Sequence, residues 1–335
     1  MKKLTFAATC CMAMLAGCQQ AEEIVNPSEE LIMSIEASIG DAARSRYASN
    51  NDKGTPYSLK FVEGDKIGVF VDDRAAVTEW TKTSNEDWST TPNPVYWPGK
   101  GSEGYDFYAF YPYPSENNVI SRTSVPMPSL EGQDGTISSI SARDFMVATT
   151  HKAYTDNNGK VSFTGPNDCF KHVSSLVAIT ILKESDLKES TIHKISFEGT
   201  KTNLGSLTSY SFENKDSPVT VTTSIDNVVS AENFQISMAE ETEDKTLYFI
   251  LNSGANLSNV TFSIEYQTGL KSYIATKTGL GEGTLTSGNR YNFKLNITDG
   301  VLSITGNEIQ GWGEGTNMED IIINKPQENS NNETD

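Results

Sequence analysis

The chain has 335 residues and a formal net charge of −18 at pH 7. This acidity argues against nucleic acid and anionic lipid as partners, because their phosphates require a basic surface. It is typical of a protein that stays soluble at a crowded surface. The length predicts about two domains, each large enough for its own core.

The N-terminus has the pattern of an export signal. Lys2 and Lys3 precede an apolar run over 4–14 that is shorter than the roughly 20 residues a membrane span requires. The run ends at Leu15-Ala16-Gly17-Cys18, which resembles the bacterial lipobox. That resemblance implies a cut between Gly17 and Cys18 and lipid on Cys18, so that acyl chains hold the protein to a membrane. The alternative is an ordinary signal peptide.

Of the four cysteines, only one remains for the folded part of the chain. Cys10 and Cys11 leave with the signal, Cys18 carries the lipid, and Cys169 stands alone. An intrachain disulfide is therefore excluded, and packing must stabilise the exported protein. We expect Cys169 to be a small buried hydrophobe, with a reactive thiol as the alternative.

Directly behind the signal come a polar segment and the first predicted strand. Glu22 and Glu23 resemble the surface-export signal of Bacteroidetes lipoproteins, which implies that the protein lies on the outer face of the outer membrane. The alternative is that residues 18–28 are a plain polar tether. Apolar residues then alternate with other side chains, which predicts a strand with one buried face. The apolar set is Leu31, Met33, Ile35, Ala37 and Ile39. The following stretch, which holds Arg44 and Arg46, predicts an exposed loop open to proteases or a solvated linker.

Further strands are predicted at 67–71, 95–98, 105–111 and 144–148. The aromatic residues of this region fill a core or form a stacking platform for glycans; the candidates for the platform are Trp80, Trp88, Trp97 and Tyr113. Asn158-Gly159 predicts a hairpin turn, because this pair readily adopts positive φ. The same turn lacks the closing glutamate of a calcium loop, so we expect no metal there.

The sequence predicts a domain boundary near 165–168 and a second set of strands behind it. These strands lie at 176–182, 192–197, 219–221, 246–251, 260–266, 291–297 and 318–324, with at most a short helix at 183–190. Their alternation predicts half-buried antiparallel strands. The expected architecture is all-β, with sandwich domains at 29–165 and 166–325 and a disordered tail at 326–335.

No motif predicts catalysis or a cofactor. His151, His172 and His193 are scattered, and neither a nucleophile elbow nor a Walker loop occurs. A carboxylate pair for glycoside hydrolysis stays open among the 44 acidic residues. The expected protein is not an enzyme.

The order of several short motifs resembles the fimbrillin family of Bacteroidales, the lipoprotein subunits of surface fimbriae. Besides the lipobox, the motifs are Glu63-Gly64-Asp65-Lys66-Ile67-Gly68-Val69-Phe70, Phe107-Tyr108-Ala109-Phe110-Tyr111-Pro112-Tyr113, Asp144-Phe145-Met146, Phe170-Lys171-His172, Leu285-Thr286-Ser287-Gly288-Asn289-Arg290-Tyr291-Asn292-Phe293 and Ile309-Gln310-Gly311-Trp312. The resemblance covers almost the whole exported chain.

The resemblance implies two tandem antiparallel β-sandwiches of Greek-key, transthyretin-like type. It also implies that an arginine-specific protease cuts a surface precursor after Arg46, or after Arg44 as second choice, and that the strand 31–39 leaves with the lipid. A strand of another subunit, supplied by Ile321, Ile322 and Ile323, would fill the open groove by β-augmentation. The product would be a fimbrium that supports adhesion to host or bacterial receptors. Because of the polar tail, the sequence does not decide whether the chain is a stalk, tip or accessory subunit of the fimbrium. The alternative function is that of a monomeric surface lipoprotein that binds glycans.

Overall fold

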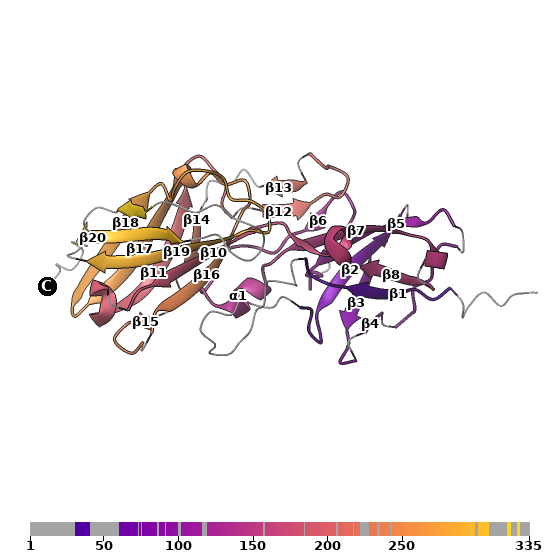
Figure 1. The fold of residues 1–335 in the computed structure, drawn as a ribbon, viewed down its shortest axis with the longest axis horizontal. Helices are drawn as coiled ribbons and strands as arrows, with labels where there is room; N and C mark the ends of the chain where they lie inside the picture. Colours follow the sequence, from indigo (N-terminus) through magenta and orange to yellow (C-terminus); the bar gives the residue numbers. More distant parts are fainter. Residues whose placement is uncertain are drawn as a thin grey trace, which may run out of the picture.

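The structure is a computed structural model that describes residues 31–40, 60–298 apart from short gaps, 301–307, 320–322 and 327–328. Strands dominate these residues, and they form several sheets (Figure 1). An all-β fold is therefore confirmed. Within the described ranges, no helix has the length and apolar character needed to cross a membrane.

One antiparallel sheet, here called the N-terminal sheet, gathers strands from the first half of the chain. Its order is β4 (Trp88–Ser89), β3 (Thr78–Lys82), β2 (Lys66–Val71), β5 (Tyr105–Tyr111), β7 (Met146–Lys152) and β9 (Lys171–His172). The central strand β2 reads as a nearly continuous apolar run because both of its faces are buried. Ile67, Val69 and Val71 pack into one cluster, and Phe70 packs into another.

Two larger sheets hold the strands of the second half. The first has the order β16 (Lys245–Leu251), β10 (Ser175–Ile181), β19 (Arg290–Thr298), β20 (Val301–Asn307) and β21 (Asp320–Ile322). The second has the order β14 (Val228–Ala231), β11 (Ser190–Gly199), β17 (Val260–Thr268), β18 (Lys271–Thr278) and β22 (Gln327–Glu328), with β15 (Ile236–Ser237) paired to β11. Phe197 of β11 and Phe249 of β16 lie 5.1 Å apart between ring centroids, so these sheets pack face to face.

Not every strand pair is antiparallel as predicted. β10 pairs with β19 in parallel, and β1 (Ser34–Ala37) pairs in parallel with β8 (Lys160–Phe163). Parallel neighbours need a long connection between them. Both pairs meet that condition, because more than a hundred residues separate their strands. Part of the predicted tail also forms a strand, β22, on the edge of β18.

A small sheet joins the two groups of strands. β6 (Val125–Pro126) pairs with β12 (Leu207–Tyr210), which pairs with β13 (Val219–Val221). The segment behind β6, with α1 (Ile137–Ser141), reaches β16, where Tyr248 N donates to Gly135 O at 2.9 Å. In Figure 1 these elements lie between the N-terminal sheet and the larger sheets. Chain that precedes the predicted boundary therefore packs on strands that follow it.

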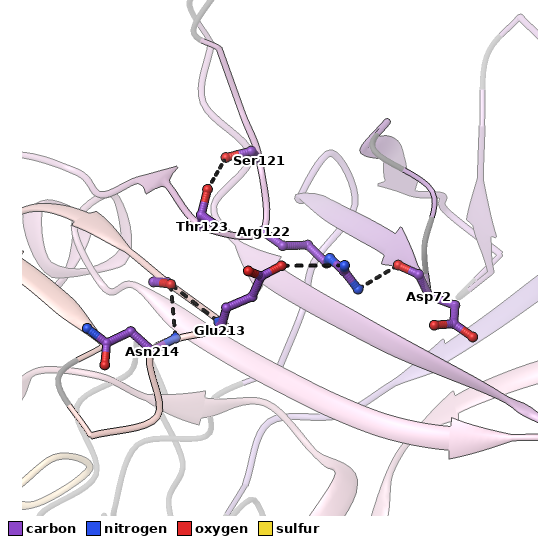
Figure 2. A network of polar contacts seen from close by, with 7 residues as sticks. Asp72, Ser121, Arg122, Thr123, Glu213 and Asn214 are labelled. Carbon is purple, nitrogen blue, oxygen red and sulfur yellow. Dashed lines mark hydrogen bonds and ion pairs between the residues drawn. The ribbon is translucent and has the colours of Figure 1, made fainter.

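Arg122 ties the same junction together with polar contacts. Its Nη1 donates to the carbonyl of Asp72 at 2.6 Å, and its Nη2 lies 3.4 Å from the carboxylate of Glu213 (Figure 2). Its guanidinium also lies 5.4 Å from the ring centroid of Tyr108. One side chain thus contacts the loop after β2, the strand β5 and the loop after β12.

The remaining helices are single turns. They are α2 (Gly165–Asp168) and the 3-10 turns η1 (Tyr154–Asp156), η2 (Asp186–Glu189) and η3 (Leu257–Asn259). The turn η2 occupies the position where a short helix was expected. Cys169 follows α2 and is buried, as predicted.

The predicted Asn-Gly hairpin is wrong as a hairpin, although the turn exists. Asn158 has φ 50° and Gly159 has φ 76°, the positive values that the pair was expected to adopt. However, the flanking strands do not pair with each other in the described chain. β7 pairs with β5 and β9, whereas β8 pairs with β1. The turn η1 separates β7 from β8 and redirects the chain.

Candidate assembly groove

The predicted first strand is present as β1 and lies in a groove beside β8. Ser34 N donates to Gly159 O at 3.2 Å, and Ser38 N donates to Phe163 O at 3.0 Å. Before β1, Met33 N donates to Val95 O at 2.8 Å. The segment therefore has backbone partners from two separate parts of the chain.

Every second side chain of this segment is directed into the core, as the alternation predicts. Met33, Ile35 and Ile39 are buried, and Leu31 and Ala37 pack partly against the same cluster. Full burial of such a side chain is worth roughly 1.5–3 kcal/mol, so the three buried ones contribute roughly 5–9 kcal/mol as an upper bound. The segment is thus held mainly by one apolar face.

Aromatic side chains form the floor of the groove. Phe61 lies 5.1 Å from Phe170 and 5.1 Å from Trp88 between ring centroids, in edge-to-face geometry. Trp97 lies 5.1 Å from Phe107, and its Nε1 donates to the carbonyl of Gly159 at 2.7 Å. Edge-to-face pairs stabilise beyond the burial of apolar area, and these contacts join residues outside β1, so the floor is held by contacts other than those with β1.

The second edge of β1 faces β4. Among the described strands, β1 pairs only with β8, and β4 pairs only with β3. A cleft of about 400 Å³ separates them, lined by β1 and by Lys82, Asp87, Trp88 and Lys160. The N-terminal sheet and the β1–β8 pair therefore do not join along this side.

Several predicted site residues lie outside the described residues: Gly17, Cys18, Arg44, Arg46 and Ile323. Ile321 and Ile322 lie in β21, which pairs antiparallel with β20 at the edge of a sheet. Each of these roles stays a prediction. In Figure 1, β1 and β20, the partner of β21, lie toward different ends of the molecule.

The aromatic residues proposed for a glycan platform belong to the core. Trp80, Trp88 and Trp97 are 2%, 6% and 3% exposed. Tyr113 is half-buried and stacks on Phe110, with ring centroids 6.0 Å apart. A platform needs exposed rings in a row, and the tryptophans do not provide one.

Two motif residues make a buried polar pair that spacing alone did not reveal. His172 Nδ1 lies 2.8 Å from a carboxylate oxygen of Asp144, and their side chains are 4% and 3% exposed. A carboxylate only accepts, so the imidazole donates from Nδ1. Both residues belong to the short motifs noted in the sequence, and the pair joins the residue two positions before β7 to β9.

A model of the fimbrillin-like family matches residues 47–312, which is more than half of the chain. A search of curated proteins gave no match. Among solved structures, a candidate cell adhesion protein of Bacteroides ovatus is 15% identical with a TM-score of 0.58, and the alignment covers 85% of this chain and 99% of that one. A candidate cell adhesion protein of Bacteroides uniformis is 16% identical with a TM-score of 0.56, covering 84% and 99%. The tip fimbrial protein Mfa3 of Porphyromonas gingivalis, solved with a C-terminal truncation, is 10% identical with a TM-score of 0.45, covering 84% and 99%.

These similarities define an all-β protein whose fold is shared with Bacteroides proteins of the adhesion class. The chain belongs to the fimbrillin-like family, since the family model spans residues 47–312. It is a structural fimbrial or adhesion protein and not an enzyme. The family resemblance expected from the short motifs is confirmed.

Proposed function

We propose that the chain is a subunit of surface fimbriae that assembles by strand exchange. The precursor is exported, carries lipid on Cys18, and sits on the outer face of the outer membrane. An arginine-specific protease cuts after Arg46, with Arg44 as second choice, and the segment containing β1 leaves. Two tandem sandwich domains, 29–165 and 166–325, make up the body of the subunit.

The observation that carries this proposal is the placement of β1. It is a short separate strand whose buried face packs on an aromatic floor that the rest of the chain supplies. Its removal leaves β8 with an open edge and exposes the floor, and open edges of this kind recruit extended chain. The segment around Ile321–Ile323 of another subunit then fills the groove, because backbone bonds and alternating pockets accept an apolar strand.

Three of the four other described arginines are half-buried and hydrogen-bonded, which disfavours a cut at those three positions. Arg122 binds Asp72 O, and Arg143 binds the carbonyls of Glu131 and Gly132. Arg290 Nε donates to Asn292 Oδ1 at 2.7 Å. Arg74 Nη1 donates to Tyr96 O at 3.1 Å, but Arg74 itself is exposed between two strands. Cleavage after Arg74 therefore serves as the internal measure of how readily the protease cuts any exposed arginine of this chain.

The test is limited digestion of the purified full chain in detergent with an arginine-specific protease, followed by mass spectrometry and by electrophoresis without boiling. Cleavage after Arg46 or Arg44 and a ladder of heat-labile oligomers would support the proposal. An Arg44→Ala/Arg46→Ala variant must stay monomeric under the same conditions. Cleavage there with a persistent monomer would favour a tip or capping subunit, and no cleavage there would contradict the maturation scheme.

A locked variant separates the cut from strand release. Glu36 of β1 and Ser162 of β8 are direct partners in the parallel register and lie on the outward side. Cysteines at these two positions meet the spacing of a disulfide, whose Cα atoms lie roughly 4.4–6.8 Å apart. The oxidised Glu36→Cys/Ser162→Cys protein should be cut yet stay monomeric, and reduction should restore the ladder. Oligomers formed by the oxidised protein would show that β1 does not have to leave.

A further inference from the structure

A second, unrelated cleft lies at the junction of the two groups of strands. It measures about 760 Å³ and opens between β7 and β9, the loop from β12 to β13, and the turns that follow β16 and precede β19. Ligand sites for small molecules and side chains fall in this size range and prefer junctions of this kind. The proposed release of β1 and the groove around β1 do not involve this cleft.

Two serine hydroxyls in the wall of the cleft donate their protons to the main chain. Ser253 Oγ and Ser287 Oγ both donate to the carbonyl of Val173, each at 2.8 Å. A serine hydroxyl has one proton and two lone pairs, so each oxygen keeps the capacity to accept from a ligand. Ser253 Oγ also lies 3.2 Å from Ser175 Oγ, which donates to Thr286 O at 2.8 Å. Asn252 Nδ2 donates to Asn203 O at 3.2 Å, which orients the amide and leaves its oxygen as an acceptor.

The charged groups of the lining favour a cationic ligand. Asp216 lines the cleft and is exposed, and the described lining holds no lysine or arginine. His172 also lines the cleft, and its Nδ1 lies 2.8 Å from the carboxylate of Asp144. The site thus offers a carboxylate and several neutral acceptors to a group that carries protons and positive charge. Ammonium and guanidinium groups have this chemistry, since they donate three and five hydrogen bonds and accept none.

The rest of the lining suits an aliphatic stem. The half-buried side chains of Val147 and Val219 contribute apolar surface, the half-buried ring of Tyr210 also lines the cleft, and the buried Leu285 backs it. Long basic side chains bury their methylene groups on apolar surface while the charged head meets polar groups. An aromatic ring within reach of the head would add a cation–π contact.

We propose that this junction cleft binds an aliphatic chain that ends in an ammonium or guanidinium group. The group is carried either by the lysine or arginine of a peptide segment or by a free alkylamine. The methylene stem lies along Val147 and Val219, and the head lies between Asp216 and the hydroxyls of Ser253 and Ser287.

Titration calorimetry on the full chain in detergent tests this proposal. The probes are N-acetyl-lysine methylamide and N-acetyl-arginine methylamide for the peptide-borne group, butylammonium for the free amine, and N-acetyl-norleucine methylamide as the uncharged control. The charged probes should bind and the norleucine probe should not. Tighter binding of the two amides identifies a peptide side chain as the source, and tighter binding of butylammonium identifies a free amine.

Variants locate the binding in this cleft. Asp216→Asn should weaken the charged probes roughly fivefold, the factor that corresponds to about 1 kcal/mol for a partly exposed ion pair. Ser287→Ala should weaken them as well. The matched control is Glu282→Gln, which removes an equal charge from an exposed residue outside the lining. Absence of binding, equal binding of norleucine, or equal effects of Asp216→Asn and Glu282→Gln would overturn the proposal.

Discussion

Gln133 joins the chain before β7 to the edge strand β16 through a buried amide. Its side chain is 1% exposed. Its Nε2 donates to Ile250 O and to Leu130 O, each at 2.9 Å, and its Oε1 accepts from Ile250 N at 2.7 Å. The amide thus completes the hydrogen bonds of Ile250 as a neighbouring strand would. We predict that Gln133→Met, which keeps the length of the side chain, destabilises the protein strongly.

The magnitude follows from the groups left behind. Methionine returns none of the three hydrogen bonds, and both the N–H and the C=O of Ile250 stay buried without this partner. An unsatisfied buried group costs roughly 1–3 kcal/mol, so the expected loss in the free energy of unfolding is about 3 kcal/mol. Denaturant unfolding followed by tryptophan fluorescence measures it, and hydrogen exchange at the Ile250 amide reports the same loss locally.

The matched control is Gln267→Met. Gln267 Nε2 donates to Gly269 O at 2.9 Å within an exposed hairpin. A surface change of this kind stays within roughly 0.5 kcal/mol. If Gln133→Met cost no more than this control, the inference that the amide of Gln133 supports the edge of β16 would be refuted.

Three further changes test other contacts. The hydrogen bond to Asp106 raises the pKa of His151 above 6.5. The stabilisation from this pair is therefore complete below pH 6.5 and is lost as the pH rises through the pKa of the folded protein. Asp106→Asn should lower the pKa of His151 in an NMR titration, and an unchanged pKa would contradict the pairing. Gly68→Ala places a Cβ 2.2 Å from the buried ring of Phe110 and should cost about 2 kcal/mol or more in denaturant unfolding, whereas a neutral result would show that the ring can move. Arg122→Gln should lower the free energy of unfolding by about 1–2 kcal/mol, because the ion pair, the bond to a carbonyl and the ring contact are lost together. An unchanged free energy of unfolding would show that these contacts are not coupled to folding.

The pattern of side chains in the sequence was enough to predict the features that depend only on residues close together in the chain. The alternation from Leu31 to Ile39 predicted a strand with one buried face, and β1 has that face. The positive φ of Asn158 and Gly159 followed from the intrinsic preference of this pair. The short motifs, read in order, were sufficient to indicate the family.

Pairing partners depended on the tertiary structure instead. The alternation of apolar residues predicts that a strand has one buried face, but it does not predict which strand pairs with that strand. The parallel pairing of β1 with β8, the separation of β7 from β8, and the amide of Gln133 on β16 all join residues that are far apart in the sequence. The buried pair of Asp144 and His172 has the same origin.

Sequence by itself determined that this chain is an all-β member of a fimbrial family, because strand-forming alternation and family motifs are local. Only the tertiary structure decided that β1 lies on an aromatic floor, and that the two groups of strands meet in a cleft where two serine hydroxyls donate to the main chain. The reason is that core packing and hydrogen-bond saturation are set by contacts across the fold, which no local pattern contains.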